Sequence, residues 1–391
     1  RSNKADPVAP GEVPSPNPAA MLPDTVLHSA ALDALRALLS LPTAVPDEAV
    51  LRFPNAAALR AFVAAAPGLG LEVLSQLPTL NSVRVGYDDL ANLQRYLDSS
   101  RGSPNRPEVE PHVWLSTPQI QPSTAPNNEG GSAALGVSFL QAVNAVGERA
   151  DWGSGVTVAV LDTGLQSHPT FGEGQITRVD LVQDGKSPHG HGTSVASLIA
   201  GQDERVPGVA PGVTLLDIRV ANEKGISVST VLAQGIITAA DRGAQVINIS
   251  LGGYDDSTLL RRAVDYAVGK GAIVVAAAGN ENYDQLAFPA GFEKVISVGS
   301  VDRNQKQAWF SNSGKNLDFT APGVGLPVAW DQDKMANASG TSQSAAIASG
   351  VIATYLSRGV KSADILRILK VTARPTGASA DKVGHGVVWL E

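Results

Sequence analysis

The feature that most constrains the fold is a series of near-continuous apolar runs in the second part of the chain. Strands that are apolar along their whole length are buried on both faces, and helical crossovers between them make their neighbours parallel. Helical patterns separate most of the runs. From residue 135 onward we therefore predict an α/β fold, with a parallel sheet and helices on both of its faces. The expected strands are 156–162, 213–220, 244–251, 272–279 and 295–301.

An earlier part of the chain, residues 48–115, shows a different order. Short runs at 48–53, 71–77, 82–87 and 109–115 resemble strands, and helical patterns follow the first and the third. Asn55 can cap the first of these helices, and Asp88 and Asp89 open the second. The order β-α-β-β-α-β predicts a small ferredoxin-like α+β domain of about 70 residues.

Composition marks the borders of this small domain. Five prolines fall within the first twenty residues, which lack apolar periodicity, so we predict a flexible Pro-rich leader and then a short helix at 32–39. Turn formers and small polar residues fill the segment after residue 115, which indicates an exposed, cleavable linker. The predicted divisions are 1–30 (leader), 31–115 (small domain), 116–130 (linker) and 131–391 (parallel-sheet domain).

Three global properties exclude classes of protein. The chain has no cysteine, which excludes disulfides, thiolate metal sites and thiol catalysis. The formal net charge of −7 argues against a nucleic-acid partner. No apolar run approaches the roughly 18 residues that a membrane span needs, so we expect no membrane span.

Chemistry in a parallel sheet is expected at the carboxyl ends of its strands. Asp162 ends the run VAVLD there, although an Asp before Thr-Gly often only caps a turn. His191 lies between glycines at the start of a small-residue helix. With His189 it could instead bind a metal, but no carboxylate or cysteine accompanies the pair at metal-ligand spacing. A histidine in a glycine turn also needs no function, so neither signal decides alone.

Two later residues complete the candidate site. Ser342 follows Gly340 and Thr341 at the start of a Ser/Ala-rich helix, where free N–H groups and the helix dipole stabilise a developing oxyanion. The alternative is a serine that only caps or packs its helix. Asn280 ends a buried strand after Gly279, where its amide can donate to an oxyanion, or can simply form a turn.

The combination is stronger than any single residue. Asp162, His191, Asn280 and Ser342 occur in that order on successive elements of one predicted α/β domain. A serine nucleophile needs a base, and that base needs an acidic group to orient it. The chain offers one of each in glycine-rich surroundings.

These motifs resemble those of the subtilisin-like serine peptidases, the subtilases. The similarity extends over about residues 136–355, and the segment before the linker is similar to the inhibitory propeptide of that family. The matching segments are AVLDTGL, GHGTSVAS, GVAPG, VINISLGG, VVAAAGN, FSNSG, DFTAPG and SGTSQSAA.

The resemblance implies roles for individual residues. Ser342 would be the nucleophile, His191 the general base and Asp162 the group that orients the imidazole. Asn280 and the Ser342 backbone N–H would form the oxyanion hole. The pocket walls would be Ser250, Leu251, Gly252, Ala277, Ala278 and Gly279, and the substrate would pair as an added strand with Gly225, Ile226 and Ser227. These walls carry no charge, so we expect an apolar residue before the scissile bond.

The chain also departs from the family pattern. Gln343, Ala346 and Ile347 stand where the family usually has Met and, later, Pro-His, and Ser194 stands where a second His or Arg is common. The segment 197–212 is shorter than in members whose loop binds calcium. Calcium could still bind at acidic side chains, although a solvated acidic face explains them as well. These side chains are Asp180, Asp184, Asp203 and Glu204.

The sequence thus predicts a serine endopeptidase that acts on proteins or peptides and is made as a zymogen. Its propeptide would be an intramolecular inhibitor, and self-cleavage would fall at about 115–128. No cofactor is required by the sequence. We expect a secreted, periplasmic or cell-envelope enzyme. The alternatives are a processing peptidase dedicated to one partner protein and a non-catalytic binding protein with this fold.

Overall fold

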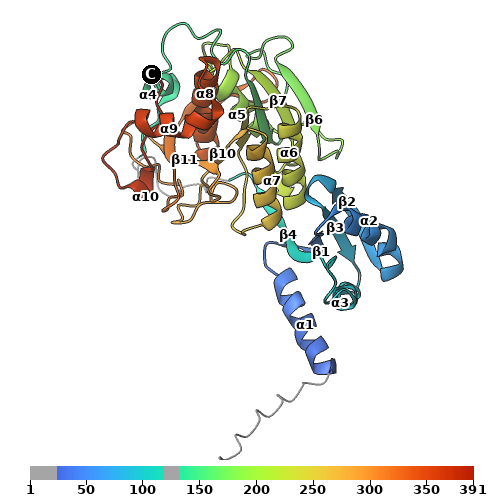
Figure 1. Ribbon diagram of the computed structural model, residues 1–391. Coiled ribbons are helices and arrows are strands. Elements are labelled where there is room, and N and C mark those ends of the chain that lie inside the picture. The colour runs from blue at the N-terminus through green and yellow to red at the C-terminus, as the bar shows by residue number, and fades with distance from the viewer. Residues whose placement is uncertain (1–23, 119–131) are drawn as a thin grey trace, which may run out of the picture.

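A seven-stranded parallel sheet organises the larger part of the molecule (Figure 1). The computed structural model describes residues 24–118 and 132–391. The strand order is β12-β11-β10-β9-β5-β7-β6, and every registered neighbour is parallel, which confirms the predicted sheet. The edge strands β6 and β12 were not predicted, because each is short and lacks a long apolar run. The strands are β5 (Thr157–Asp162), β6 (Ile176–Asp180), β7 (Thr214–Arg219), β9 (Val246–Ile249), β10 (Ile273–Ala277), β11 (Val295–Val301) and β12 (Phe319–Pro322).

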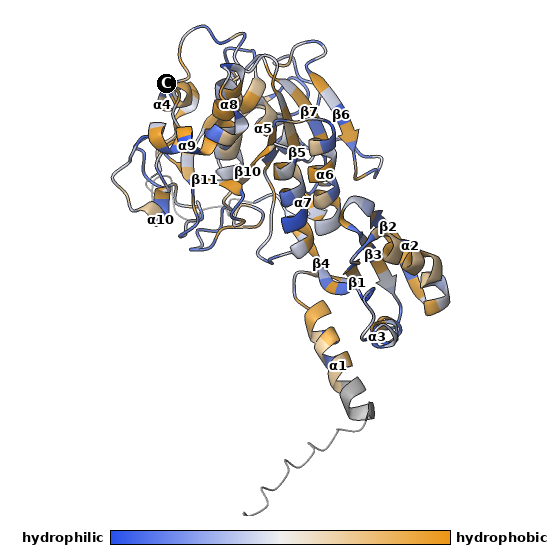
Figure 2. Cartoon of the chain, in the orientation of Figure 1, coloured by the Kyte–Doolittle hydropathy of each residue, from blue (hydrophilic) through white to orange (hydrophobic). Residues whose placement is uncertain are grey.

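Helices cover both faces of this sheet, as predicted. Helices α5 (Gly190–Ala200) and α8 (Thr341–Ser357) contribute to one hydrophobic cluster, and α6 (Ser229–Asp241) and α7 (Thr258–Gly269) to the other. Along β5, Val158 and Val160 join the first cluster while Ala159 and Leu161 join the second. This two-residue alternation between two buried faces is the physical reason for the continuous apolar runs. Figure 2 shows the hydrophobic colours of the strands between the covering helices.

The N-terminal part forms a second, antiparallel sheet with its own core. Its order β2-β3-β1-β4 and two crossing helices confirm the predicted ferredoxin-like arrangement. The Asn55 side chain accepts a hydrogen bond from the Ala58 N–H at 2.9 Å, and Asp89 caps the second helix similarly. The elements are β1 (Ala44–Arg52), α2 (Ala56–Ala65), β2 (Leu71–Leu77), β3 (Ser82–Tyr87), α3 (Leu90–Ser99) and β4 (Glu108–Ser116).

Helix α1 (Asp24–Leu39) begins earlier than the sequence predicted. It occupies part of the segment 1–30 that we expected to be a leader, whose residues 1–23 lie outside the described part. The helix starts directly after Pro23 and contains no proline, which is consistent with the poor fit of proline in helix interiors. It lies beside α3 and β4 at one end and extends away from both sheets (Figure 1).

Strand β8 (Ile226–Val228) joins the two parts of the molecule. It belongs to the larger part, yet it pairs antiparallel with β4 as the fifth strand of the N-terminal sheet. The first residues of the predicted linker take part in this pairing: Ser116 is exposed but ends β4, and Thr117 is buried. Linker residues 119–130 lie outside the described part. The remaining elements are β13 (Leu326–Ala329), β14 (Met335–Ala338), α4 (Phe139–Ala142), α9 (Ser362–Thr372) and α10 (Ala380–Val383).

Candidate active site

The structure brings Asp162 and His191 into direct contact. Asp162 ends β5, and His191 is the second residue of α5. The His191 Nδ1 lies 2.8 Å from Asp162 Oδ1 and 3.0 Å from Oδ2. The Thr163 backbone N–H and hydroxyl donate to Oδ1 at 2.6 and 3.1 Å, which fixes the carboxylate. Burial lowers the pKa of His191, but the charge and hydrogen bond of Asp162 raise it, and the net pKa lies above its usual value.

Glycine is required beside this pair. A Cβ at Gly192 would lie 2.4 Å from the Gly164 carbonyl oxygen and 3.3 Å from Asp162 Oδ1. The first distance is too short for any side chain, so the close approach of α5 to the turn after β5 needs glycine. His189 caps α5 by accepting from the His191 N–H at 3.3 Å, and its ring packs edge-on against Trp330.

Ser342 lies at the start of α8, where the sequence placed it. Its side chain is buried, and Oγ lies 3.4 Å from the Ser250 carbonyl oxygen, a weak hydrogen bond. Across the two described ranges, no hydrogen bond joins this hydroxyl to the His191 ring. The Gly340 that precedes the helix has φ +147°, and a Cβ there would lie 2.7 Å from Gln343 Oε1 and 3.1 Å from Asn280 Nδ2.

The Asn280 amide is oriented by a residue that the sequence did not single out. The Thr341 backbone N–H and hydroxyl both donate to Asn280 Oδ1 at 2.9 Å. Because the amide oxygen is held in this way, the amide nitrogen points in the other direction. It donates to the carbonyl oxygen of Pro118 at 3.1 Å. Because Thr341 directly precedes Ser342, the sequence could have indicated that it lies in the candidate site.

The chain itself lies where a substrate strand was expected. Ser116 exchanges two backbone hydrogen bonds with Gly252, at 2.9 and 3.0 Å, and the Thr117 N–H donates to the Gly225 carbonyl at 2.8 Å. On the Gly225 side, Ser116 is also in register with Ile226 of β8. Residues 115–117 thus form the middle strand between the two segments that the sequence assigned to substrate.

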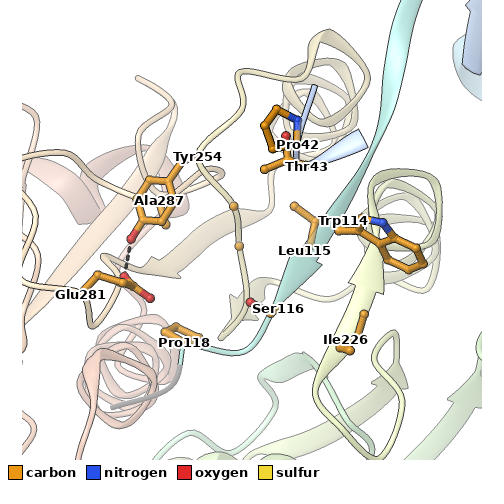
Figure 3. A pocket seen from close by; sticks show the side chains of 13 residues that line it. Pro42, Thr43, Trp114, Leu115, Ser116, Pro118, Ile226, Tyr254, Glu281 and Ala287 are labelled. Atoms are coloured by element: carbon orange, nitrogen blue, oxygen red, sulfur yellow. Dashed lines mark hydrogen bonds between the residues drawn. The ribbon is translucent and has the colours of Figure 1, made fainter. Parts of the chain in front are cut away.

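A cavity of about 460 Å³ opens beside this strand (Figure 3). Of the predicted substrate-binding residues, Ile226, Gly252 and Gly279 line it. Others support the walls from behind, because Leu251, Ala277 and Ala278 are buried in hydrophobic clusters. Ser250 is buried, and its hydroxyl accepts a hydrogen bond from Asn248 Nδ2 at 3.0 Å.

A charged residue outside the predicted walls also lines this cavity. Glu281 lines the cavity, and Figure 3 shows its carboxylate directed at Tyr254. The Tyr254 hydroxyl donates to Glu281 Oε2, as do the Asn280 N–H at 2.8 Å and Asn312 Nδ2 at 3.3 Å. Burial, and then the hydrogen bond to Glu281, raise the pKa of Tyr254, so the phenol stays a neutral donor. Glu281 directly follows Asn280, so the sequence could have placed it near the candidate site.

Two departures from the family pattern contact each other. The Gln343 side chain donates from Nε2 to Ser194 Oγ at 3.1 Å, and both residues are buried. Gln343 follows Ser342 on α8, and Ser194 lies three residues after His191 on α5. The bond therefore links the two helices that carry these residues. Ala346 and Ile347 are fully buried within the core cluster around α8.

The acidic side chains considered for calcium are engaged elsewhere. Asp180 and Asp184 bind Arg219, at 3.2 and 2.8 Å, and Asp203 binds Arg205. Glu204 is exposed. In the described part of the chain, no group of three or more His, Asp or Glu side chains could hold a metal ion.

Comparisons with known proteins agree with this geometry. A family model described as the subtilase family matches residues 153–386, so the chain belongs to the subtilase family. It is a subtilisin-like serine endopeptidase. It is 35% identical over 247 residues to thermitase of Thermoactinomyces vulgaris, and this aligned region covers 61% of this chain and 86% of thermitase. It is also 35% identical over 268 residues to subtilisin BL of Lederbergia lenta, covering 66% and 98%.

Two further comparisons cover less of the other protein. A thermophilic serine proteinase of Bacillus sp. (strain AK1) is 37% identical over 227 residues, 56% of this chain and 57% of that protein. Fervidolysin of Fervidobacterium pennivorans, described as a keratinolytic enzyme related to subtilisin, shares the fold with a TM-score of 0.73 at 24% identity. That match covers 89% of this chain and 60% of fervidolysin. Because residues 132–391 are only about two thirds of the chain, the structural likeness extends into the residues before 132.

No helix of residues 24–118 and 132–391 is both long and apolar enough to cross a bilayer.

Proposed function

We propose that Ser342, His191 and Asp162 form the catalytic triad of this endopeptidase, with Asn280 as an oxyanion-hole donor. His191 takes the proton from Ser342 Oγ as the oxygen attacks the substrate carbonyl carbon. The carbonyl oxygen becomes an oxyanion that accepts hydrogen bonds from Asn280 Nδ2 and the Ser342 N–H. The C–N bond then breaks, and His191 gives its proton to the leaving amine.

The second half of the reaction releases the acyl group from Ser342. Water attacks the ester carbonyl carbon while His191 accepts a proton from it. The ester C–O bond breaks, His191 gives its proton to Ser342 Oγ, and the product acid leaves as a carboxylate after losing its own proton to solvent. Asp162 supports both halves because its carboxylate stabilises the protonated imidazole, in line with the raised pKa of His191.

We further propose that residues 24–118 include the inhibitory propeptide of a zymogen. The observation that carries this proposal is the Asn280 Nδ2 contact to the Pro118 carbonyl, together with the pairing of β4 and β8. The chain occupies its own candidate site in the manner of a substrate. An enzyme whose site is filled in this way is latent until the strand is cut and released. The predicted export to the cell envelope or the medium would suit such latency.

A serine-directed fluorophosphonate probe and mass spectrometry test the proposal. We expect the purified chain to cleave itself after the N-terminal sheet and the processed enzyme to be labelled at Ser342. Ser342→Ala should abolish both events. Ser339→Ala, three residues earlier, is the matched control and should retain both.

The outcomes separate the candidate functions. Self-cleavage of Ser342→Ala would exclude Ser342 as the nucleophile, and a folded chain that is never labelled would indicate a binding protein instead. Casein separates a broad endopeptidase from one dedicated to a single partner protein. A broad endopeptidase digests casein, whereas a dedicated one processes itself and leaves casein intact.

A further inference from the structure

We propose that the peptide bond after Pro118 is the processing site of this chain, and that proline at this position makes its cleavage slow. The inference rests on the proposed zymogen function and adds the bond and its rate. Pro118 is the residue whose carbonyl oxygen lies at the candidate oxyanion hole, 3.1 Å from Asn280 Nδ2. In Figure 3 it lies beside Glu281 at the end of the strand that enters the cavity.

The register of the strand selects this bond. Ser116 is paired with Gly252, and the Thr117 N–H is bonded to Gly225 on the opposite side. A shift by one residue would exchange the two sides for every residue of the strand. It would also move Leu115 from its site against Gly253, where this leucine is 3% exposed. Apolar burial and backbone pairing therefore agree on one alignment, with Pro118 last.

The same register shows what proline removes. In an antiparallel ladder with Ser116 opposite Gly252, residue 118 faces Ser250. Any residue but proline would direct an N–H at the Ser250 carbonyl. Proline has no N–H, and its ring holds φ near −65°, away from the extended values of a strand.

The unused acceptor lies beside the nucleophile. With no N–H from residue 118, the Ser250 carbonyl accepts from Ser342 Oγ at 3.4 Å. The hydroxyl is thereby directed at a carbonyl that cannot take its proton, instead of at His191. An N–H at position 118 would occupy this carbonyl and leave the hydroxyl free to donate to the base. Proline thus weakens the substrate strand and misdirects the nucleophile at the same bond.

Cleavage at this bond follows the two-step reaction given above. Ser342 Oγ forms an ester with the Pro118 carbonyl carbon as the bond to the nitrogen of residue 119 breaks, and His191 protonates that nitrogen. Water then releases Pro118 as a carboxylate. The step needs no other reactant.

Time-resolved mass spectrometry of the purified full-length chain tests both parts. The wild-type chain should give a first fragment that begins at Gln119. Pro118→Ala restores the N–H with little added bulk, and it should process at the same bond about tenfold faster, the factor typical of one backbone hydrogen bond. Pro122→Ala, which also removes a proline from the segment after the strand, is the matched control and should process at the wild-type rate.

Two results would overturn the inference: a first cut at another bond, or equal rates for Pro118→Ala and wild type. Failure of the proposed function looks different, because neither chain would then be processed and neither would be labelled by the fluorophosphonate probe. A melting temperature within a few degrees of wild type shows that the Pro118→Ala chain is folded and that its rate can be compared.

Discussion

The two sheets of this molecule are stabilised in different ways. Both faces of the seven-stranded sheet are covered by apolar side chains of its own helices. The N-terminal sheet has one small core of its own and packs its remaining apolar residues, among them Leu77 and Val113, against the cluster of α6 and α7. The last residues of its strand β4 form antiparallel pairs with β8 of the larger part. The N-terminal sheet therefore depends on its neighbour, which suits the propeptide role proposed for it.

The contact between the two parts also contains buried titratable groups. The His112 ring is fully buried, with Nδ1 2.6 Å from Glu48 Oε2 and Nε2 2.9 Å from Thr230 Oγ1. Glu110 accepts from the Leu259 N–H at 2.9 Å, at the first turn of α7. A carboxylate there satisfies a free N–H and faces the positive end of the helix dipole. The contact thus places titratable groups of the N-terminal sheet against α6 and α7 of the larger part.

The largest effect is expected from Asn280→Ala, which separates chemistry from docking. This change removes the donor at the candidate oxyanion hole and leaves the β4–β8 pairing in place. We expect kcat on a peptide to fall by about 10²–10³-fold, the loss already established for removal of the corresponding asparagine in a subtilisin. Steady-state kinetics of the processed enzyme measure it. Release of the N-terminal part by this variant before cleavage would show that docking and catalysis are not separable.

Acid is expected to have an intermediate effect, on the docking of the N-terminal part. Burial lowers the pKa of His112 to about 4, and its hydrogen bond to Glu48 only partly opposes this. The docked state therefore favours neutral His112 and loses stability as pH falls below about 6.5, the pKa of a free histidine. Docking should weaken by up to about tenfold per pH unit until pH 4.

After cleavage, dissociation of the N-terminal fragment from the larger part can be followed by fluorescence between pH 4 and 8, which measures this effect. The variant His112→Gln should flatten the pH dependence between pH 4 and 6.5. His385→Gln, which changes an exposed histidine of the larger part, is the control. An unchanged slope in His112→Gln would assign the acid response to Glu48 instead, because its lowered pKa also gives stability that is lost as pH falls.

The smallest effect is expected in the larger part, and it has the opposite pH dependence. Asp217 of β7 is buried, its Oδ2 accepts from the Leu165 N–H at 3.1 Å, and its Oδ1 has no partner among the described residues. Burial raises its pKa to about 7, although the Leu165 bond opposes the rise. The folded state therefore favours the protonated acid, and it loses stability as pH rises from about 4 to 7.

The variant Asp217→Asn imitates the protonated acid and can keep the bond to Leu165. It should raise the melting temperature by a few degrees at pH 9 and by less at pH 5. Calorimetry at the two pH values measures this difference. Asp284→Asn, at an exposed site, should give no pH-dependent difference. Equal shifts at both pH values for Asp217→Asn would show that ionisation of Asp217 is not what destabilises the sheet.

Much of the fold could be predicted because the two sheets leave different patterns in the sequence. Burial on both faces explains the apolar runs of β5 and β10, and Asn55 and Asp89 mark the starts of the helices that they cap. The edge strands were missed because β6 is half exposed and β12 has four residues. The start of α1 was misjudged because the proline-rich composition before Asp24 obscured it.

The sequence by itself determined the family, the α/β class and the order of Asp162, His191, Asn280 and Ser342, because these depend on local pattern and spacing. Only the tertiary structure decided which groups meet across long separations. His112 meets Glu48 and Thr230, Gln343 meets Ser194, and Glu281 lines a cavity whose predicted walls did not include it. It also decided that the Pro118 carbonyl oxygen lies against the Asn280 amide. Strand register depends on burial and pairing between distant segments, which no local pattern contains.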